Sequence, residues 1–390
     1  MTRILPTDHD HAFGTRAVHA GQVREPLSGA VMTPIYQTST YVQEGLGKHQ
    51  GFEYARTRNP TRDAWERCVA SLEGAEHGFA FASGLASLDA VLKLLKAGDH
   101  VISGENVYGG SHRLMERIYG ELGLRFSFVD MREIANIEAA ITPATRMVYA
   151  ETPTNPMMAL ADLAAVGDLT KAHGFLFVID NTFATPYFQQ PLTHGADIVL
   201  HSATKYLNGH SDMVGGMLVT SRDDIAERLA FIQNAAGGVP GPMDCWLALR
   251  GVKTLPLRMR QHDANGRRVA EWCVNSKIAT NVYYPGLPDH PQHELAKRQM
   301  RGFGGMISLD LGNADRARSF VEKTRIFALA ESLGGVESLI GHPASMTHAS
   351  VPRPMREAMG LTDSLIRLSC GIEDADDLIA DLDQAYAALK

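Results

Sequence analysis

The fold of this chain is indicated by the stretch Asp197-Ile198-Val199-Leu200-His201-Ser202-Ala203-Thr204-Lys205, in which an apolar run ends in a lysine. A second run, Phe175-Leu176-Phe177-Val178-Ile179, ends in Asp180, 25 residues before that lysine. Both runs are apolar without alternation, which is typical of strands that are covered on both faces. They predict an α/β protein in which Asp180 and Lys205 lie at the ends of buried strands.

An alternation of helical patterns and short apolar runs from Thr61 onward supports this fold class. Helical patterns are expected over residues 61–73, 84–96 and 112–122. The interleaved apolar runs predict strands over residues 78–82, 100–103, 125–129, 146–150, 175–179, 197–200 and 216–219. Such an alternation predicts a mostly parallel sheet. Ligands of these sheets bind beyond the carboxyl ends of the strands, where Asp180 and Lys205 are expected.

A chain of 390 residues is long enough for two domains. We expect an N-terminal arm over residues 1–60, a large domain over residues 61–250 and a smaller C-terminal α/β domain over residues 251–390. The first fifty or so residues show no sustained period, so we expect another surface, such as a second subunit, to order them.

The small domain is expected to follow a long helical pattern from Met243 to Ser276 that is interrupted near Pro256. Two strands, over residues 305–311 and 365–369, and a closing helix over residues 375–389 would complete it.

The composition is that of an ordinary globular protein, with 45% hydrophobic and 21% charged residues. A net charge of -7 argues against nucleic acid or an anionic membrane as a partner. We see no apolar signal core and no stretch long enough to span a bilayer. The cysteines form no Cys-x-x-Cys pair and are expected to be reduced packing residues of a cytoplasmic protein; they are Cys68, Cys245, Cys273 and Cys370. No metal site is expected.

A lysine and an aspartate at strand ends fit the requirements of pyridoxal 5'-phosphate (PLP). The Lys205 amine would form a Schiff base with the aldehyde, and Asp180 would keep the pyridine nitrogen protonated. Ser202 and Thr204 lie close enough in sequence to bond the phosphate. Taken alone, Lys205 could equally be a surface lysine, which is common in α/β proteins.

Two further features are weak evidence by themselves, but both suit the same cofactor. Gly84 follows a predicted strand and opens a predicted helix, where free N–H groups attract a phosphate. Glycine is common in such turns for packing reasons. Tyr108 could stack on a flat ring or could be an ordinary core tyrosine.

Several segments in this order resemble the Cys/Met metabolism family of PLP-dependent enzymes, which act in trans-sulfuration. The resemblance runs from about Thr15 to the C-terminus and rests on Tyr54–Thr61, Phe81–Ala86, Tyr149–Pro156, Ile179–Thr182, His201–Tyr206, Ser332–Ser338 and Leu365–Ser369. It is strongest to the cystathionine γ-lyase and γ-synthase branches. It implies the aspartate-aminotransferase-like type I fold, assembled as a homotetramer of two active dimers.

The resemblance also implies a role for each matched residue. Lys205 is the Schiff-base lysine and the mobile acid and base, and Tyr108 stacks on the ring and could protonate the leaving sulfur. The other cofactor contacts are Asp180, Gly84, Leu85, Ser202 and Thr204, with Tyr54 and Arg56 reaching the phosphate of the neighbouring subunit. The substrate contacts are Asn155, Arg367, Ser332, Glu331 and Arg113, among which Arg367 clamps the α-carboxylate.

The implied activity is γ-elimination of L-cystathionine to L-cysteine, 2-oxobutanoate and ammonia. A synthase that replaces the acyl group of an O-acylhomoserine by cysteine is the alternative. Methionine γ-lyase is disfavoured, because that branch typically carries a cysteine where this chain has Gly110. Arg113 and Glu331 would suit the charged far end of cystathionine, or they could be ordinary surface charges. Release of hydrogen sulfide from cysteine stays open, and a scaffold without turnover is disfavoured because no matched catalytic residue is missing.

Overall fold

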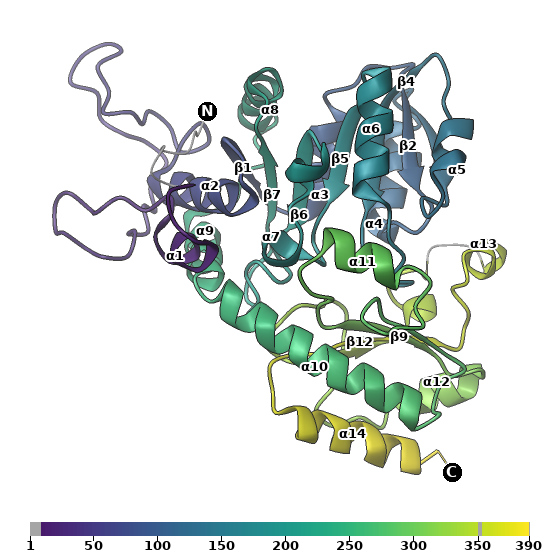
Figure 1. Ribbon diagram of the computed structural model, residues 1–390. Coiled ribbons are helices and arrows are strands. Elements are labelled where there is room, and N and C mark those ends of the chain that lie inside the picture. The colour runs from purple at the N-terminus through teal and green to yellow at the C-terminus, as the bar shows by residue number, and fades with distance from the viewer. Residues whose placement is uncertain (1–8, 350–352, 390) are drawn as a thin grey trace.

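Residues 9–349 and 353–389 are described by a computed structural model, in which helices surround two β-sheets (Figure 1). The larger sheet has seven strands in the order β1 (His77–Phe81), β7 (Gly216–Thr220), β6 (Ile198–Ser202), β5 (Leu176–Asp180), β4 (Thr145–Glu151), β2 (His100–Gly104) and β3 (Arg125–Val129). The strands from β6 to β3 pair in parallel, whereas β7 is antiparallel to both β1 and β6. The expected α/β class with a mostly parallel sheet is confirmed.

The antiparallel return of β7 follows from the connection that precedes it. Residues 203–215, all of them described, form turns and bends rather than a crossover helix. Parallel neighbours need such a crossover, so a chain that turns back directly pairs antiparallel. This connection carries Thr204 and Lys205 and keeps them at the carboxyl edge of the sheet.

Apolar clusters on both faces of the larger sheet explain why its strands read as continuous apolar runs. On one face, Tyr149 and Val178 pack with α3 (Gly84–Leu92) and α8 (Asp223–Ala236). On the other face, Val148 and Phe177 pack with α5 (Ile134–Ala139) and α6 (Leu163–His173), which lies in front of the sheet in Figure 1. Successive side chains of a strand point to opposite faces, so each strand contributes to two apolar clusters.

The smaller sheet has five strands in the order β10 (Ala328–Leu329), β11 (Leu339–Gly341), β12 (Leu365–Ser369), β9 (Met306–Asp310) and β8 (Asn281–Tyr283). Strands β9 and β12 pair antiparallel and confirm the two strands expected here. Strands β8, β10 and β11 were not expected, because runs of two or three residues carry no periodic signal. Helix α14 (Ala375–Ala387) closes this part of the chain.

The long helical pattern between the sheets forms two helices, α9 (Pro242–Val252) and α10 (Leu255–Asn275). Pro256 lies in the first turn of α10, where proline is tolerated, so the interruption is the start of a new helix. Figure 1 shows α10 running from the larger sheet to the smaller one beside α14. The domain boundaries expected at residues 60 and 250 stay predictions.

The remaining helical elements are short, except for α2. They are α1 (Phe13–His19), α2 (Pro60–Glu73), α4 (Gly109–Arg113), a π-helix (Leu114–Tyr119), α7 (Thr185–Phe188), α11 (His293–Gln299), α12 (Ala314–Val321), α13 (Arg353–Ala358) and 3-10 turns at Pro191–His194 and Pro343–Ser345. The helix expected over residues 84–96 ends at Leu92, because Leu94 and Leu95 donate to carbonyls three residues back in a tighter turn. The helix expected over residues 112–122 begins at Gly109 and continues as the π-helix.

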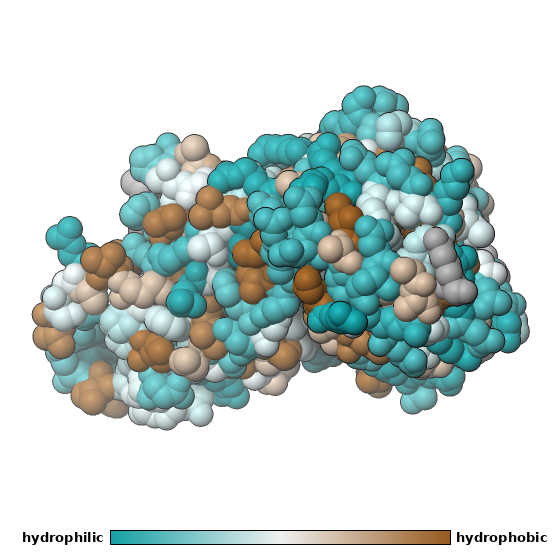
Figure 2. Space-filling model, turned by 90° about the horizontal axis from the view of Figure 1, so that it is seen from below, coloured by the Kyte–Doolittle hydropathy of each residue, from teal (hydrophilic) through white to brown (hydrophobic). Residues whose placement is uncertain are grey.

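The N-terminal arm is irregular as expected apart from α1, which the sequence reading missed. Beyond α1 it extends away from both sheets in Figure 1, and Leu27, Val31, Val42 and Leu46 are almost fully exposed. Figure 2 shows exposed hydrophobic residues on this side of the molecule, interspersed with hydrophilic ones. Large exposed apolar patches mark interaction surfaces, so we still expect a second surface to cover the arm. Residues 1–8 of the predicted arm lie outside the described residues.

Within the described ranges, no helix combines the length and the apolar character needed to cross a bilayer.

Candidate active site

A cavity of about 350 Å³ lies beyond the carboxyl ends of β4, β5 and β6. Most of the residues singled out from the sequence line it, namely Gly84, Leu85, Tyr108, Asn155, Asp180, Ser202, Thr204, Lys205, Glu331, Ser332 and Arg367. They come from both sheets and from loops far apart in the chain. The folded chain therefore brings these residues together at the edge of the sheet where a ligand was expected.

Lys205 lies in the turns that follow β6, with its amine inside the cavity. Its Nζ donates to Ser332 Oγ at 2.8 Å. Burial lowers the pKa of this amine to about 8, with Arg367 acting in the same direction and Glu331 opposing it. A buried amine with a lowered pKa is a better nucleophile at neutral pH than an ordinary lysine.

Asp180 ends β5 as a buried carboxylate whose two oxygens both accept hydrogen bonds. Oδ1 accepts from Thr182 N at 3.0 Å and from Thr182 Oγ1 at 2.5 Å, and Oδ2 accepts from Tyr149 Oη at 3.2 Å. Burial raises the pKa of Asp180, while the bonds from Thr182 oppose that shift. A cation placed against this carboxylate would offset the cost of its burial.

Glu151 is a second buried carboxyl group, which the sequence reading missed. It ends β4 directly beside Asp180 on β5. Its Oε2 accepts from Tyr108 N at 2.9 Å and its Oε1 from Asn155 N at 3.0 Å. Burial, and then the charge of Asp180, hold the pKa of Glu151 well above its usual range. The signal was available, since an apolar run ends in Glu151 as another ends in Asp180.

The start of α3 faces the same cavity and can hold an anion. Ser83 caps the helix, accepting from Ala86 N at 3.0 Å, and the first N–H groups of a helix have no partner within it. A Cβ at Gly84 would lie 2.9 Å from Ser202 Cβ, so glycine permits the close approach of α3 to the end of β6. The Thr204 hydroxyl lines the cavity while bonded to the Gly215 backbone.

Arg367 reaches the cavity from β12 of the smaller sheet and is 4% exposed. Its Nη1 donates to Asn155 Oδ1 and its Nη2 to the Ser332 carbonyl, both at 2.8 Å. Burial lowers the pKa of Arg367 to about 10, so the guanidinium stays charged at neutral pH.

The loop that contacts both Lys205 and Arg367 is held in an unusual backbone conformation. Ser332 has a φ of 97°, which side-chain-bearing residues rarely adopt and which persists where the surroundings enforce it. A Cβ at Gly334 would lie 2.8 Å from Tyr206 N, so glycine lets this loop pack against the Lys205 segment.

Among the described residues that line the cavity, Tyr54, Arg56 and Arg113 are not found. Arg113 ends α4 and is exposed. Tyr54 is 46% exposed, and the Arg56 guanidinium lies 5.6 Å from the centre of the Tyr54 ring. The roles of these three residues, like those of the lining residues, stay predictions.

Comparison with known proteins identifies the family. The chain matches the family model described as Cys/Met metabolism PLP-dependent enzyme over residues 14–387. It is similar to cystathionine gamma-lyase of Bacillus subtilis (strain 168), with 53% identity over 371 residues that cover 95% of this chain and 98% of that protein. Cystathionine beta-lyase of Lactococcus lactis subsp. cremoris (strain MG1363) is 51% identical with the same coverage.

A probable cystathionine gamma-synthase of Herpetosiphon aurantiacus is 55% identical over 318 residues, which cover 81% of this chain and all of that protein (100%). Among solved structures, cystathionine gamma-lyase from Lactobacillus plantarum complexed with L-serine superposes with a TM-score of 0.95 and 47% identity. That match covers 97% of this chain and 99% of the other. Relatives of similar identity thus carry three different activity names.

The lowered pKa of Lys205 predicts how the apoprotein captures PLP as pH changes. The neutral amine attacks the aldehyde, and the amine is protonated below its pKa. We therefore expect the capture rate to rise with pH, to reach half of its maximum near pH 8, where the pKa of Lys205 lies, and to level off above it. Stopped-flow absorbance after mixing apoprotein with PLP between pH 6 and 10 measures this, with Lys205→Ala as the control. A capture rate that climbs steadily to pH 10 would contradict the lowered pKa.

Proposed function

The chain belongs to the Cys/Met metabolism family of PLP-dependent enzymes, and on that premise we propose that it cleaves the Cγ–S bond of L-cystathionine. The products would be L-cysteine, 2-oxobutanoate and ammonia. One observation carries the choice of substrate: the buried guanidinium of Arg367 and the exposed carboxylate of Glu331 line the same cavity. L-cystathionine is an amino acid whose far end carries a second ammonium and carboxylate, so it can engage both charges.

The described residues fit the cofactor of this family. Lys205 offers an amine for the aldehyde, Asp180 a carboxylate for the ring nitrogen, and the start of α3 a set of N–H groups for the phosphate. When bound, PLP supplies an electron-withdrawing ring that stabilises negative charge at the substrate Cα.

Lys205 would move the protons of the reaction. With a pKa of about 8, its amine can accept a proton from Cα and deliver it again within one turnover near neutral pH. Ser332 Oγ, 2.8 Å from Nζ, would hold the amine in place between these transfers. Tyr108, whose N–H is fixed by Glu151, would cover the ring and stand near the leaving sulfur as a proton donor.

Arg367 would bind the substrate α-carboxylate with its planar guanidinium. Its present partners, Asn155 Oδ1 and the Ser332 carbonyl, hold the guanidinium in one orientation. A guanidinium held in one orientation would also hold the substrate in one position relative to Lys205.

Tyr54 and Arg56 would complete the phosphate site of a neighbouring subunit within a homotetramer of two active dimers. Both side chains are exposed, and neither lines the cavity of its own chain within the described residues. The exposed apolar arm supports the same arrangement, because it offers a surface for that neighbour.

The alternative is a γ-synthase, which would use the same residues and capture the intermediate with cysteine. Methionine γ-lyase is less favoured. That branch typically carries a cysteine at the position of Gly110. A Cβ at Gly110 would lie 2.4 Å from Tyr108 Cε1, so a cysteine would force the Tyr108 ring out of its present position.

A product assay separates these activities. We expect purified holoenzyme to convert L-cystathionine to 2-oxobutanoate and cysteine, measured by chromatography of the oxo acids and thiols. Pyruvate and homocysteine as main products would identify β-elimination and contradict the proposal. Much faster turnover of an O-acylhomoserine with cysteine would identify the synthase.

Removal of the Glu331 carboxylate tests substrate recognition. We expect Glu331→Ala to raise KM for L-cystathionine roughly two- to fivefold, the scale of one exposed charge pair. Glu322→Ala, an exposed glutamate at the end of α12, is the matched control and should leave KM unchanged. An unchanged KM in Glu331→Ala would show that Glu331 is an ordinary surface charge and does not bind the substrate.

A further inference from the structure

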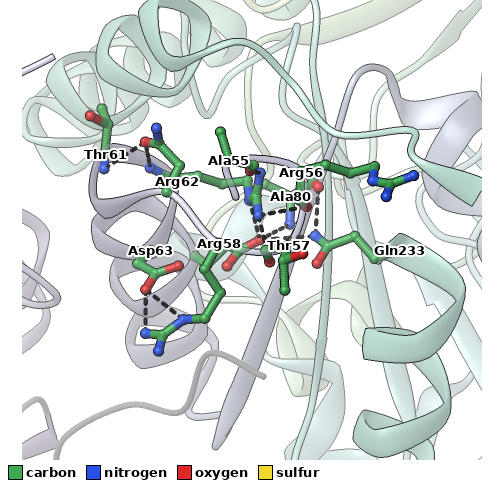
Figure 3. A network of polar contacts seen from close by, with 11 residues as sticks. Ala55, Arg56, Thr57, Arg58, Thr61, Arg62, Asp63, Ala80 and Gln233 are labelled. Atoms are coloured by element: carbon green, nitrogen blue, oxygen red, sulfur yellow. Dashed lines mark hydrogen bonds and ion pairs between the residues drawn. The ribbon is translucent and has the colours of Figure 1, made fainter. Parts of the chain in front are cut away.

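Arg62, in the first turn of α2, is a buried cation without a part in the proposed chemistry. Its side chain is 2% exposed. Nη1 donates to the Ala55 carbonyl at 2.8 Å, and Nη2 donates to the carbonyls of Arg56 at 3.1 Å and Thr57 at 2.9 Å. One planar guanidinium thus gathers three consecutive carbonyls of the arm into a single turn (Figure 3).

The helix start fixes the direction from which Arg62 approaches this turn. Asn59 caps α2, accepting from Thr61 N at 2.9 Å and from Arg62 N at 3.4 Å, and Pro60 occupies the first turn. The turn of residues 55–57 therefore runs directly into a rigid helix.

A buried carboxylate balances the charge of Arg62. Glu66 Oε1 lies 3.5 Å from Arg62 Nε, and both side chains are 2% exposed. The same oxygen accepts from Ala80 N at 2.8 Å and from Gln233 Nε2 at 3.0 Å. Ala80 belongs to β1, the strand that leads to Gly84, so the network ties the arm to the strand that carries the anion site of its own chain.

The side chains of the held turn point away from the network. Figure 3 shows the Arg56 side chain extending away from Arg62, while the Arg56 carbonyl faces Arg62. Tyr54, beside it, is 46% exposed. The backbone is therefore fixed from inside the protein while a cation and a phenol are presented outside.

We propose that Arg62 is a positioning residue that fixes the backbone of residues 55–57, so that Tyr54 and Arg56 reach the cofactor phosphate in a second copy of this chain. This inference rests on the proposed function, in which those two side chains serve a neighbouring site. Lysine cannot replace Arg62 in this role, because one ammonium on a flexible stem does not reproduce a planar fork aimed at three carbonyls.

The variant Arg62→Lys keeps the positive charge beside Glu66 and removes the fork. Titration of apoprotein with PLP should give a Kd raised by about the same factor as in Arg56→Ala, roughly tenfold for one charge-assisted phosphate contact. The double variant Arg56→Ala/Arg62→Lys should raise the Kd by less than the product of the two single factors, because both changes remove the Arg56 contact. Arg67→Lys is the matched control, since Arg67 on α2 donates to a different carbonyl, that of Gly21, and its Kd should stay within twofold of the wild type.

A mixing experiment tests whether the effect acts across subunits. Arg62→Lys chains mixed with Lys205→Ala chains should recover turnover at limiting PLP, because one hybrid site joins an intact Lys205 to an arm with Arg62. Additive effects in the double variant, or no recovery despite demonstrated subunit exchange, would overturn the proposal. An unchanged Kd in Arg56→Ala would overturn both the placement of Arg56 and this inference, while the product assay would still report separately on Cγ–S cleavage.

Discussion

The buried carboxylate of Asp180 is the constraint on which the rest of the site depends. Its oxygens accept bonds from Thr182 and Tyr149, yet burial still raises its pKa. Glu151 ends the adjacent strand and adds a second buried carboxyl group. Two buried carboxyl groups at neighbouring strand ends favour the binding of a cation beside them in the cavity, because a cation offsets the cost of burying negative charge. We propose that the protonated ring nitrogen of PLP meets that requirement.

Two cations line the same cavity. Lys205 arrives from the larger sheet and Arg367 from the smaller one, and burial lowers the pKa of both. Both cations face a space that a phosphate, a carboxylate and an aldehyde can occupy. Ser332 binds Lys205 through its hydroxyl and Arg367 through its carbonyl, so one loop contacts both the amine that we propose moves protons and the guanidinium that we propose holds the substrate.

The sequence predicted the strand-end residues best, because a buried parallel strand is a continuous apolar run and its last residue is visible. Lys205 and Asp180 were predicted in this way. Glu151 also ends an apolar run and could have been predicted by the same argument. The bond between Arg367 and Asn155 joins residues 212 positions apart and depends on how the two sheets pack, which no local pattern encodes. The resemblance gave each of the two as a substrate contact, but it did not predict the bond between them. The sequence did not predict the Arg62 network, because an arginine in a polar first turn of a helix is usually exposed to solvent.

The absorption spectrum of bound PLP in Asp180→Asn tests the central claim most directly. An amide in place of the carboxylate cannot hold the ring nitrogen protonated, so the account predicts depletion of the protonated-ring band. Turnover should fall by roughly 10²–10³-fold, the scale for removing one preorganised electrostatic group. An unchanged spectrum together with an unchanged rate would contradict the account, because another acid would then have to pair with the ring.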